Sequence, residues 1–181
     1  MQLDLSSDAS ITQAIQYITS TFHRLDILIN NAGASFDALL RDNALSIRDA
    51  WNQSWDTNVT GTQVLTSEAI PLLLKSSSPR LIFITSGTSA LAYTDRFDHP
   101  ALQRINASPA PGWPKREMER EINPIEAYRS AKTGLNMMMR QWFRILRNDG
   151  MKVWAVSPGF LATGLGGVGV EELRKVSGGD T

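Results

Sequence analysis

Cysteine is absent from this sequence of 181 residues, which excludes disulfide bonds and metal sites built on thiolates. A net charge is absent too, because 18 Lys and Arg balance 18 Asp and Glu, so no overall field attracts nucleic acid, an anionic membrane or a polyanionic substrate. The chain has no apolar run long enough to span a bilayer, and its first residues lack the basic and apolar regions of a secretory signal. We therefore expect a cytoplasmic protein without nucleic-acid or membrane partners.

Helical and extended patterns alternate along the chain, whose hydrophobic content of 42% is sufficient for one core. This alternation predicts an α/β fold, a doubly wound parallel sheet of the Rossmann type with three α/β/α layers, in one domain over residues 1–181. Ser46 is the expected N-cap of the middle helix, and Gly150 the expected stop of the last one. The strands are apolar almost throughout, so we expect both of their faces to be covered. The expected helices are 10–22, 46–74 and 125–148, and the expected strands are 25–29, 81–85 and 152–156.

The pattern lapses before the last helix, where several prolines and mixed charges predict an insertion at about 88–124 with one short helix. Residues 160–181 are predicted to form a flap. Asp95, Asp98 and His99 in the insertion are expected to be solvated, and no metal site is predicted. Met137 to Met139 and Trp142 are expected in the core.

Tyr128 and Lys132 are four residues apart near the start of the last predicted helix, a spacing that places them on one face. A tyrosine ordinarily titrates near pH ~10, so its use as a proton donor and acceptor near neutrality requires a positive charge nearby. Lys132 is placed to supply that charge. The same spacing also occurs on many helices by chance, so the pair alone leaves both readings open.

Other polar residues occur where the predicted strands end, which is where open α/β sheets bind ligands. Asn30-Asn31-Ala32-Gly33 ends the first strand, either as a close approach to a ligand or as an ordinary turn. Ser86 follows the second strand, where its hydroxyl can hold a substrate oxygen or merely terminate the strand. Asn58 places an amide inside the middle helix, where this residue type is mildly disfavoured.

Taken in chain order, these motifs resemble the short-chain dehydrogenase/reductase family over the whole chain except the insertion. The resemblance implies that Tyr128 is the general acid/base and that Lys132 lowers its pKa and binds the nicotinamide ribose. It also implies that Ser86 orients a carbonyl and that Asn58 holds a water of a proton relay. The implied reaction is hydride transfer between a nicotinamide and a small-molecule carbonyl or alcohol.

The same resemblance extends to the cofactor site and to one branch of the family. It implies that NADP, or else NAD, is bound by the residues named at the end of this paragraph. An insertion before the tyrosine is similar to that of the carbonyl reductases, which implies NADP and a monomer; otherwise a homo-oligomer is expected. The implied cofactor-binding residues are Asp4, Asn31, Ala32, Gly33, Tyr128, Lys132, Pro158, Gly159 and Thr163.

The family's phosphate-binding glycine turn has no counterpart here, because no glycine occurs before Gly33. The chain is therefore expected to lack the first two strands of the fold, and also the last one. Its strand at 25–29 would then have a bare edge. The run at 164–169 matches Gly-x-Gly-x-x-Gly, but it follows the strand only after the Pro158-Gly159 loop and is more typical of a flap. An alternative to the enzyme is thus a truncated, catalytically incompetent member that is unstable or acts as a binding or regulatory protein.

Overall fold

The computed structural model describes residues 2–113, 115, 125–159, 161 and 165. Its centre is a sheet of three parallel strands in the order β1-β2-β3, formed by Ile27–Asn30, Arg80–Ile84 and Lys152–Val156. Leu28 pairs with Leu81 and Leu81 with Val153, so the three strands run in register. All three therefore end at the same edge of the sheet, and the predicted α/β fold with a parallel sheet is confirmed.

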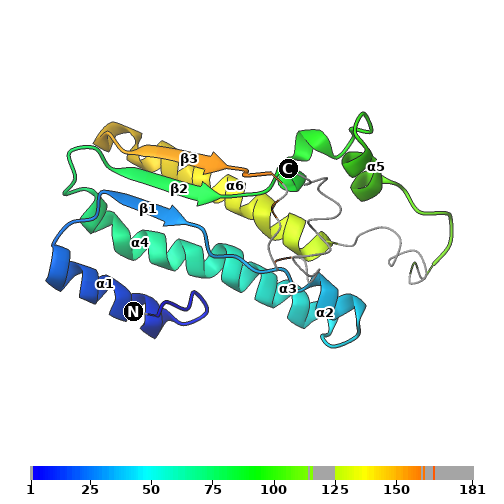
Figure 1. Cartoon of the computed structure of the whole chain (residues 1–181), viewed down its shortest axis with the longest axis horizontal. Coiled ribbons are helices and arrows are strands. Elements are labelled where there is room, and N and C mark those ends of the chain that lie inside the picture. The colour runs from blue at the N-terminus through cyan, green and yellow to red at the C-terminus, as the bar shows by residue number, and fades with distance from the viewer. Residues whose placement is uncertain (1, 114, 116–124, 160, 162–164, 166–181) are drawn as a thin grey trace, which may run out of the picture.

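Three long helices cover one face of this sheet (Figure 1). They are α1 (Asp8–Phe22), α4 (Gly61–Leu73) and α6 (Glu126–Leu146). Between them and the strands lies the core, in which Leu73, Leu81 and Phe83 are fully buried. Helix α1 begins with Ser7, whose hydroxyl accepts the backbone N–H of Ser10 as an N-cap.

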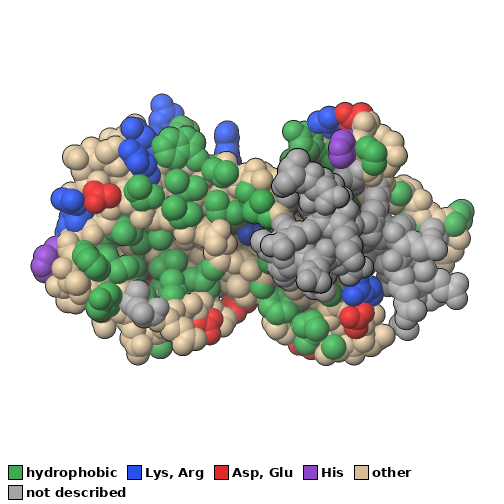
Figure 2. Space-filling model, in the orientation of Figure 1, with side chains coloured by type: hydrophobic (Ala, Val, Ile, Leu, Met, Phe, Trp, Pro, Cys, Tyr) green, Lys and Arg blue, Asp and Glu red, His purple; other side chains and the backbone are tan. Residues whose placement is uncertain are grey.

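The opposite face of the sheet is apolar and exposed among the described residues. Ile27 and Ile29 on β1 and Trp154 and Val156 on β3 are each at least 40% exposed. Figure 2 shows apolar side chains gathered over this part of the molecule. The expectation that both faces of the strands are covered is therefore wrong for the described residues, because their long helices supply one of the two helical layers.

The predicted helix at 46–74 is interrupted in its middle. Ser46 caps it as expected, accepting the backbone N–H of Asp49 at 3.1 Å. Helix α3 (Ile47–Trp55) then passes into a π-helical turn, η1 (Asp56–Thr60), before α4 begins. A π turn inside an α-helix requires one extra residue and often occurs at functional sites. This one contains Asn58.

Shorter elements complete the described part of the chain, and one of them is a helix that the sequence pattern missed. Helix α2 (Asp37–Arg41) was not predicted, whereas α5 (Pro100–Asn106) is the short helix expected within the insertion. Gly150 has a φ of 72°, the left-handed conformation that favours glycine, and it ends the last helical segment as predicted. Among the residues that the structure describes, further helical turns of the 3₁₀ type span Gly87–Ser89, Leu91–Tyr93 and Arg147–Asp149.

Two further observations concern surfaces. Met137 is 63% exposed, so its expected place in the core is wrong, whereas Met138, Met139 and Trp142 pack against the core as predicted. Helix α6 covers the sheet with one face only, so Met137, one position before Met138, points to solvent. None of the described helices combines the length and the apolarity that a membrane crossing requires.

Candidate active site

The catalytic pair predicted from the sequence lies on the first two turns of α6. The Lys132 ammonium nitrogen is 5.7 Å from the centre of the Tyr128 ring, and it donates a hydrogen bond to the backbone carbonyl of Ile84 at 3.0 Å. Lys132 is only 3% exposed, which is rare for a lysine. The helix thus places its ammonium against the end of β2.

Burial governs the protonation of both groups. It lowers the pKa of Lys132 to about 8, because the ammonium loses its hydration. It also raises the pKa of Tyr128, and a hydrogen bond with Ser86 opposes this effect only in part. Desolvation of the phenol is the largest influence on this pKa, and the lowering expected from Lys132 stays a prediction.

Asn58 uses its side chain to hold the segment that follows β1. Its amide nitrogen donates to the carbonyl of Ala34 at 2.8 Å, and its side-chain oxygen accepts the N–H of Ala34 at 3.3 Å. The same nitrogen also donates to the carbonyl of Ser54, four residues earlier, at 2.8 Å. The Asn58 side chain thus connects the segment after β1 to the helix that carries it.

Gly33 packs directly between the two buried polar groups. A Cβ at this position would lie 2.8 Å from the side-chain oxygen of Asn58 and 3.0 Å from the Lys132 nitrogen. No side chain fits into that space without displacing one of them. Asn58, Gly33 and Lys132, which are distant in sequence, therefore form one contiguous cluster at the end of the sheet.

Ser86 is fixed by its own loop and by α6. Its hydroxyl caps the 3₁₀ turn that follows, accepting the N–H of Thr88 at 3.2 Å. Thr133 and Asn136 of α6 hold Ser89 by hydrogen bonds of 2.9 and 3.0 Å. The loop that carries Ser86 is therefore tied to the helix that carries the predicted catalytic tyrosine.

The other predicted cofactor residues are placed unequally. Asn31 and Ala32 follow β1 at the same edge of the sheet, and Pro158 and Gly159 follow β3 there, all four exposed. Asp4 lies instead before α1, where its carboxylate accepts hydrogen bonds from Ser6 that lower its pKa. Thr163, the run at 164–169 and most of the predicted flap lie outside the described residues.

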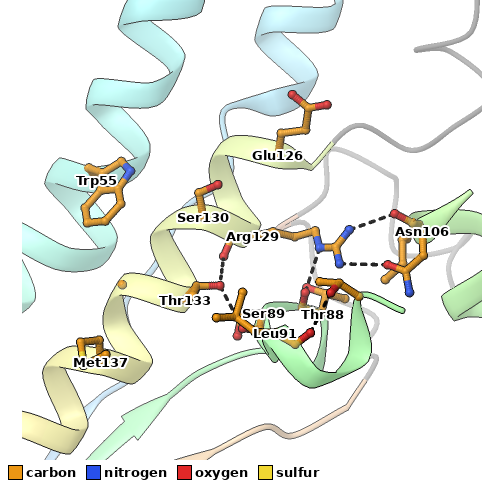
Figure 3. A pocket seen from close by; sticks show the side chains of 13 residues that line it. Trp55, Thr88, Ser89, Leu91, Asn106, Glu126, Arg129, Ser130, Thr133 and Met137 are labelled. Atoms are coloured by element: carbon orange, nitrogen blue, oxygen red, sulfur yellow. Dashed lines mark hydrogen bonds between the residues drawn. The ribbon is translucent and has the colours of Figure 1, made fainter. Parts of the chain in front are cut away.

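Arg129 joins the insertion to the catalytic helix, a role that the sequence did not reveal. Its guanidinium donates to the backbone oxygens of Thr88 and Ile105 at 2.8 and 2.9 Å, and to the side-chain oxygen of Asn106 at 3.1 Å (Figure 3). The last two acceptors are at the end of α5. Burial lowers the pKa of Arg129. Arg129, which directly follows Tyr128 in α6, thus connects this helix to α5 and to the loop that carries Ser86.

A hollow of about 690 Å³ lies beside Arg129, on the side of α6 shown in Figure 3. Its lining is mainly apolar and includes Trp55, Leu91, Ile105 and Met137. The predicted catalytic residues do not line it. This hollow is therefore a neighbour of the candidate active site and not the site itself.

Comparison with known proteins shows the family of the chain. The sequence model of the short chain dehydrogenase family matches residues 1–96, more than half of the chain. The chain belongs to the short-chain dehydrogenase/reductase family. A relative from Phoma sp, the short-chain dehydrogenase/reductase eupG, is 49% identical over 166 residues, which are 91% of this chain and 56% of that protein. The chain thus spans little more than half the length of this family member.

Solved structures share the fold of the chain. Salutaridine reductase from Papaver somniferum superposes with a TM-score of 0.64 over 97% of this chain and 74% of its own, at 22% sequence identity. The Pseudomonas aeruginosa RhlG/NADP active-site complex gives a TM-score of 0.63 over 89% of this chain and 52% of its own, at 25% identity. The parallel sheet and its helices are therefore part of the family's Rossmann fold.

The buried lysine determines how stability depends on pH. An unfolded lysine titrates near pH ~10.4, above its value of about 8 in the folded chain. Below pH 8 Lys132 is charged in both states, and the buried charge reduces the free energy of unfolding. Between these pH values the unfolded chain binds more protons, so the free energy of unfolding rises with pH, by about 3 kcal/mol in total.

Lys132→Met is expected to remove this rise, because methionine fills a similar volume without a charge. Urea unfolding at intervals from about pH 7 to 11 measures it. The free energy of unfolding of the unsubstituted chain should increase relative to the variant by about 3 kcal/mol over that range. A difference between the two proteins that stays constant with pH would contradict the burial of the ammonium.

Proposed function

We propose that this chain carries the acid/base centre of an NAD(P)-dependent oxidoreductase that transfers a hydride between a nicotinamide and a carbonyl or alcohol carbon. The observation that supports it most is the arrangement on α6, where the Tyr128 phenol lies beside Ser86 and above the buried Lys132 ammonium. Membership of the short-chain dehydrogenase/reductase family supports this class of reaction. We therefore propose a small carbonyl or alcohol compound as the substrate.

Tyr128 is the proposed general acid in the direction of reduction. A tyrosine is protonated at neutral pH, and burial of the phenol raises its pKa further, so a proton is available for the carbonyl oxygen. The Ser86 hydroxyl, close to that phenol, orients the same oxygen. In the reverse direction Tyr128 accepts the proton of the alcohol, and the nearby ammonium of Lys132 favours the phenolate electrostatically.

The residues present fit the nicotinamide end of a dinucleotide. Of the three N–H groups of Lys132, one is taken by Ile84, which leaves two for the hydroxyls of a ribose. Gly33, with no side chain, leaves the backbone close to that position. The bound nicotinamide supplies or accepts the hydride, which is chemistry that the protein side chains do not provide.

NADP is proposed ahead of NAD, supported by the RhlG/NADP complex among proteins of similar fold. The described residues contain no glycine-rich turn that could bind the phosphates of the cofactor, because their first glycine is Gly33. Asp4, Pro158 and Gly159 stay proposed contacts, as does Thr163. The alternative of an incompetent binding protein is not favoured, because the relatives found are dehydrogenases and reductases.

A chimera tests the proposal. The parts of the Phoma relative outside the matched region are joined to this chain, whose 49% identity to that relative favours correct packing. We expect the chimera to bind NADPH, seen as enhanced cofactor fluorescence, and to oxidise it with a panel of ketones and aldehydes. A folded chimera that binds the cofactor but shows no Tyr128-dependent turnover across the panel would contradict the proposed function.

A further inference from the structure

The first turn of α6 is capped from outside the helix. A helix begins with backbone N–H groups that have no partner within the helix, and a side chain at the N-cap commonly accepts one of them. The N-cap residue of α6 is Ile125, which has no such side-chain group. Asp37, at the start of α2, supplies the acceptors from about 90 residues earlier in the chain.

Asp37 accepts hydrogen bonds from two consecutive backbone N–H groups, and the second of them belongs to Tyr128. Its Oδ1 accepts the N–H of Ala127 at 2.9 Å, and its Oδ2 accepts the N–H of Tyr128 at 3.1 Å and the hydroxyl of Ser35 at 3.1 Å. The residue is only 4% exposed. Hydrogen bonds to a buried carboxylate are stronger than neutral ones, and its charge also suits a helix N-terminus.

The segment that carries Asp37 is fixed at its other end by Asn58. That side chain holds both the N–H and the carbonyl of Ala34, three residues before Asp37. Residues 34–37 therefore connect the π turn to the first turn of α6. Loss of the hydrogen bonds of Asn58 or of Asp37 would therefore shift the backbone from which the Tyr128 side chain extends towards Ser86.

We propose that Asp37 is a positioning residue for Tyr128, which sets the place of the phenol by fixing the backbone from which it projects. With the nitrogen of Tyr128 held, only two side-chain torsions separate that backbone from the hydroxyl. Loss of the carboxylate frees the first turn of α6 and lets the phenol move away from Ser86. The inference rests on the proposed function for its catalytic consequence but not for its structural one.

Amide hydrogen exchange in the chain of 181 residues tests the structural part. Asp37→Ala is expected to speed exchange at Ala127 and Tyr128 about tenfold, the factor expected for loss of an N-cap, while amides beyond Leu135 keep their rates. Asp37→Asn, which retains one acceptor oxygen, should restore part of the protection. Asp49→Ala is the matched control, because Asp49 is an exposed acid in the first turn of α3. Equal acceleration of all amides, or none at Tyr128, would overturn the proposal.

The ionisation of Tyr128 gives a second readout that does not need activity. The chain has three tyrosines, so Tyr17→Phe with Tyr93→Phe leaves Tyr128 as the only phenol that titrates in the ultraviolet. In this background Asp37→Ala should lower the pKa of Tyr128, because burial raises that pKa and a displaced phenol becomes better hydrated. An unchanged titration would overturn the proposal.

Kinetics in the chimera test the catalytic part. Asp37→Ala should lower kcat about tenfold with little change in KM, as expected when a reacting group is displaced but substrate binding is kept. Asp37→Asn should recover part of kcat. An unchanged kcat would overturn the positioning role. Absence of any Tyr128-dependent turnover would instead count against the proposed function, while hydrogen exchange and titration still decide the proposal on Asp37.

Discussion

Tyr128→Phe is expected to reduce kcat for carbonyl reduction in the chimera by about 10²- to 10⁴-fold, the range that general acid/base catalysis contributes. Phenylalanine keeps the half-buried ring and its packing against α6, so the substitution removes the proton donor and little else. Affinity for NADPH should therefore change little, which fluorescence titration measures. Steady-state rates of NADPH oxidation give kcat and KM separately.

Tyr93→Phe is the matched control for this substitution. This substitution also removes one hydroxyl, but Tyr93 lies in the insertion, where it is 41% exposed and stacked against Arg96. It should leave kcat unchanged. If Tyr128→Phe reduces kcat no more than Tyr93→Phe does, Tyr128 is not the general acid. A parallel loss of cofactor affinity would indicate that the phenol acts in binding instead.

Gly61→Ala is expected to lower the free energy of unfolding by about 3 kcal/mol, the upper part of the range for overpacking. A Cβ on Gly61 would lie 1.9 Å from the backbone oxygen of Leu5. Backbone cannot rotate away as a side chain can, so the N-terminal segment has to move as a whole. The better helix propensity of alanine, worth about 1 kcal/mol, offsets only part of this cost. Urea unfolding measures the change, and the Tm should fall by roughly 6–12 °C.

Gly134→Ala separates the backbone clash from the effect of adding a methyl group to a helix. A Cβ on Gly134 would lie 2.7 Å from the outer ring of Trp55, which is 39% exposed and is free to swing outward. The gain in helix propensity should then roughly balance the cost. Equal destabilisation by Gly61→Ala and Gly134→Ala would mean that the Leu5 contact is not as close as the structure has it.

Elements set by local patterns were predicted well from the sequence. The three strands begin and end within two residues of the expected positions, and Ser46 and Gly150 cap their helices as expected. Period, caps and turns depend on neighbours a few residues apart, which a single sequence displays. Helix α2 was missed because its five residues are too short to show a period.

The parts of the candidate site that the sequence did not reveal are contacts between distant segments. Asp37 meets Tyr128 across 91 residues, Asn58 meets Ala34 across 24, and Arg129 meets Thr88 across 41. No local pattern encodes these distances. An aspartate four residues after a strand-end glycine, or an arginine within a helix, is ordinary until the fold brings its acceptors together.

The sequence by itself determined the fold class, the order of the polar motifs and the pairing of Tyr128 with Lys132 on one helix face, because each depends on residue type and spacing. Only the tertiary structure decided how deeply the side chains of this pair are buried and how burial shifts their pKa values. Packing buries Lys132 against the end of β2, and it buries the phenol of Tyr128, which raises the pKa of that phenol. Desolvation is a property of the assembled fold, and no spacing of residues along the chain specifies it.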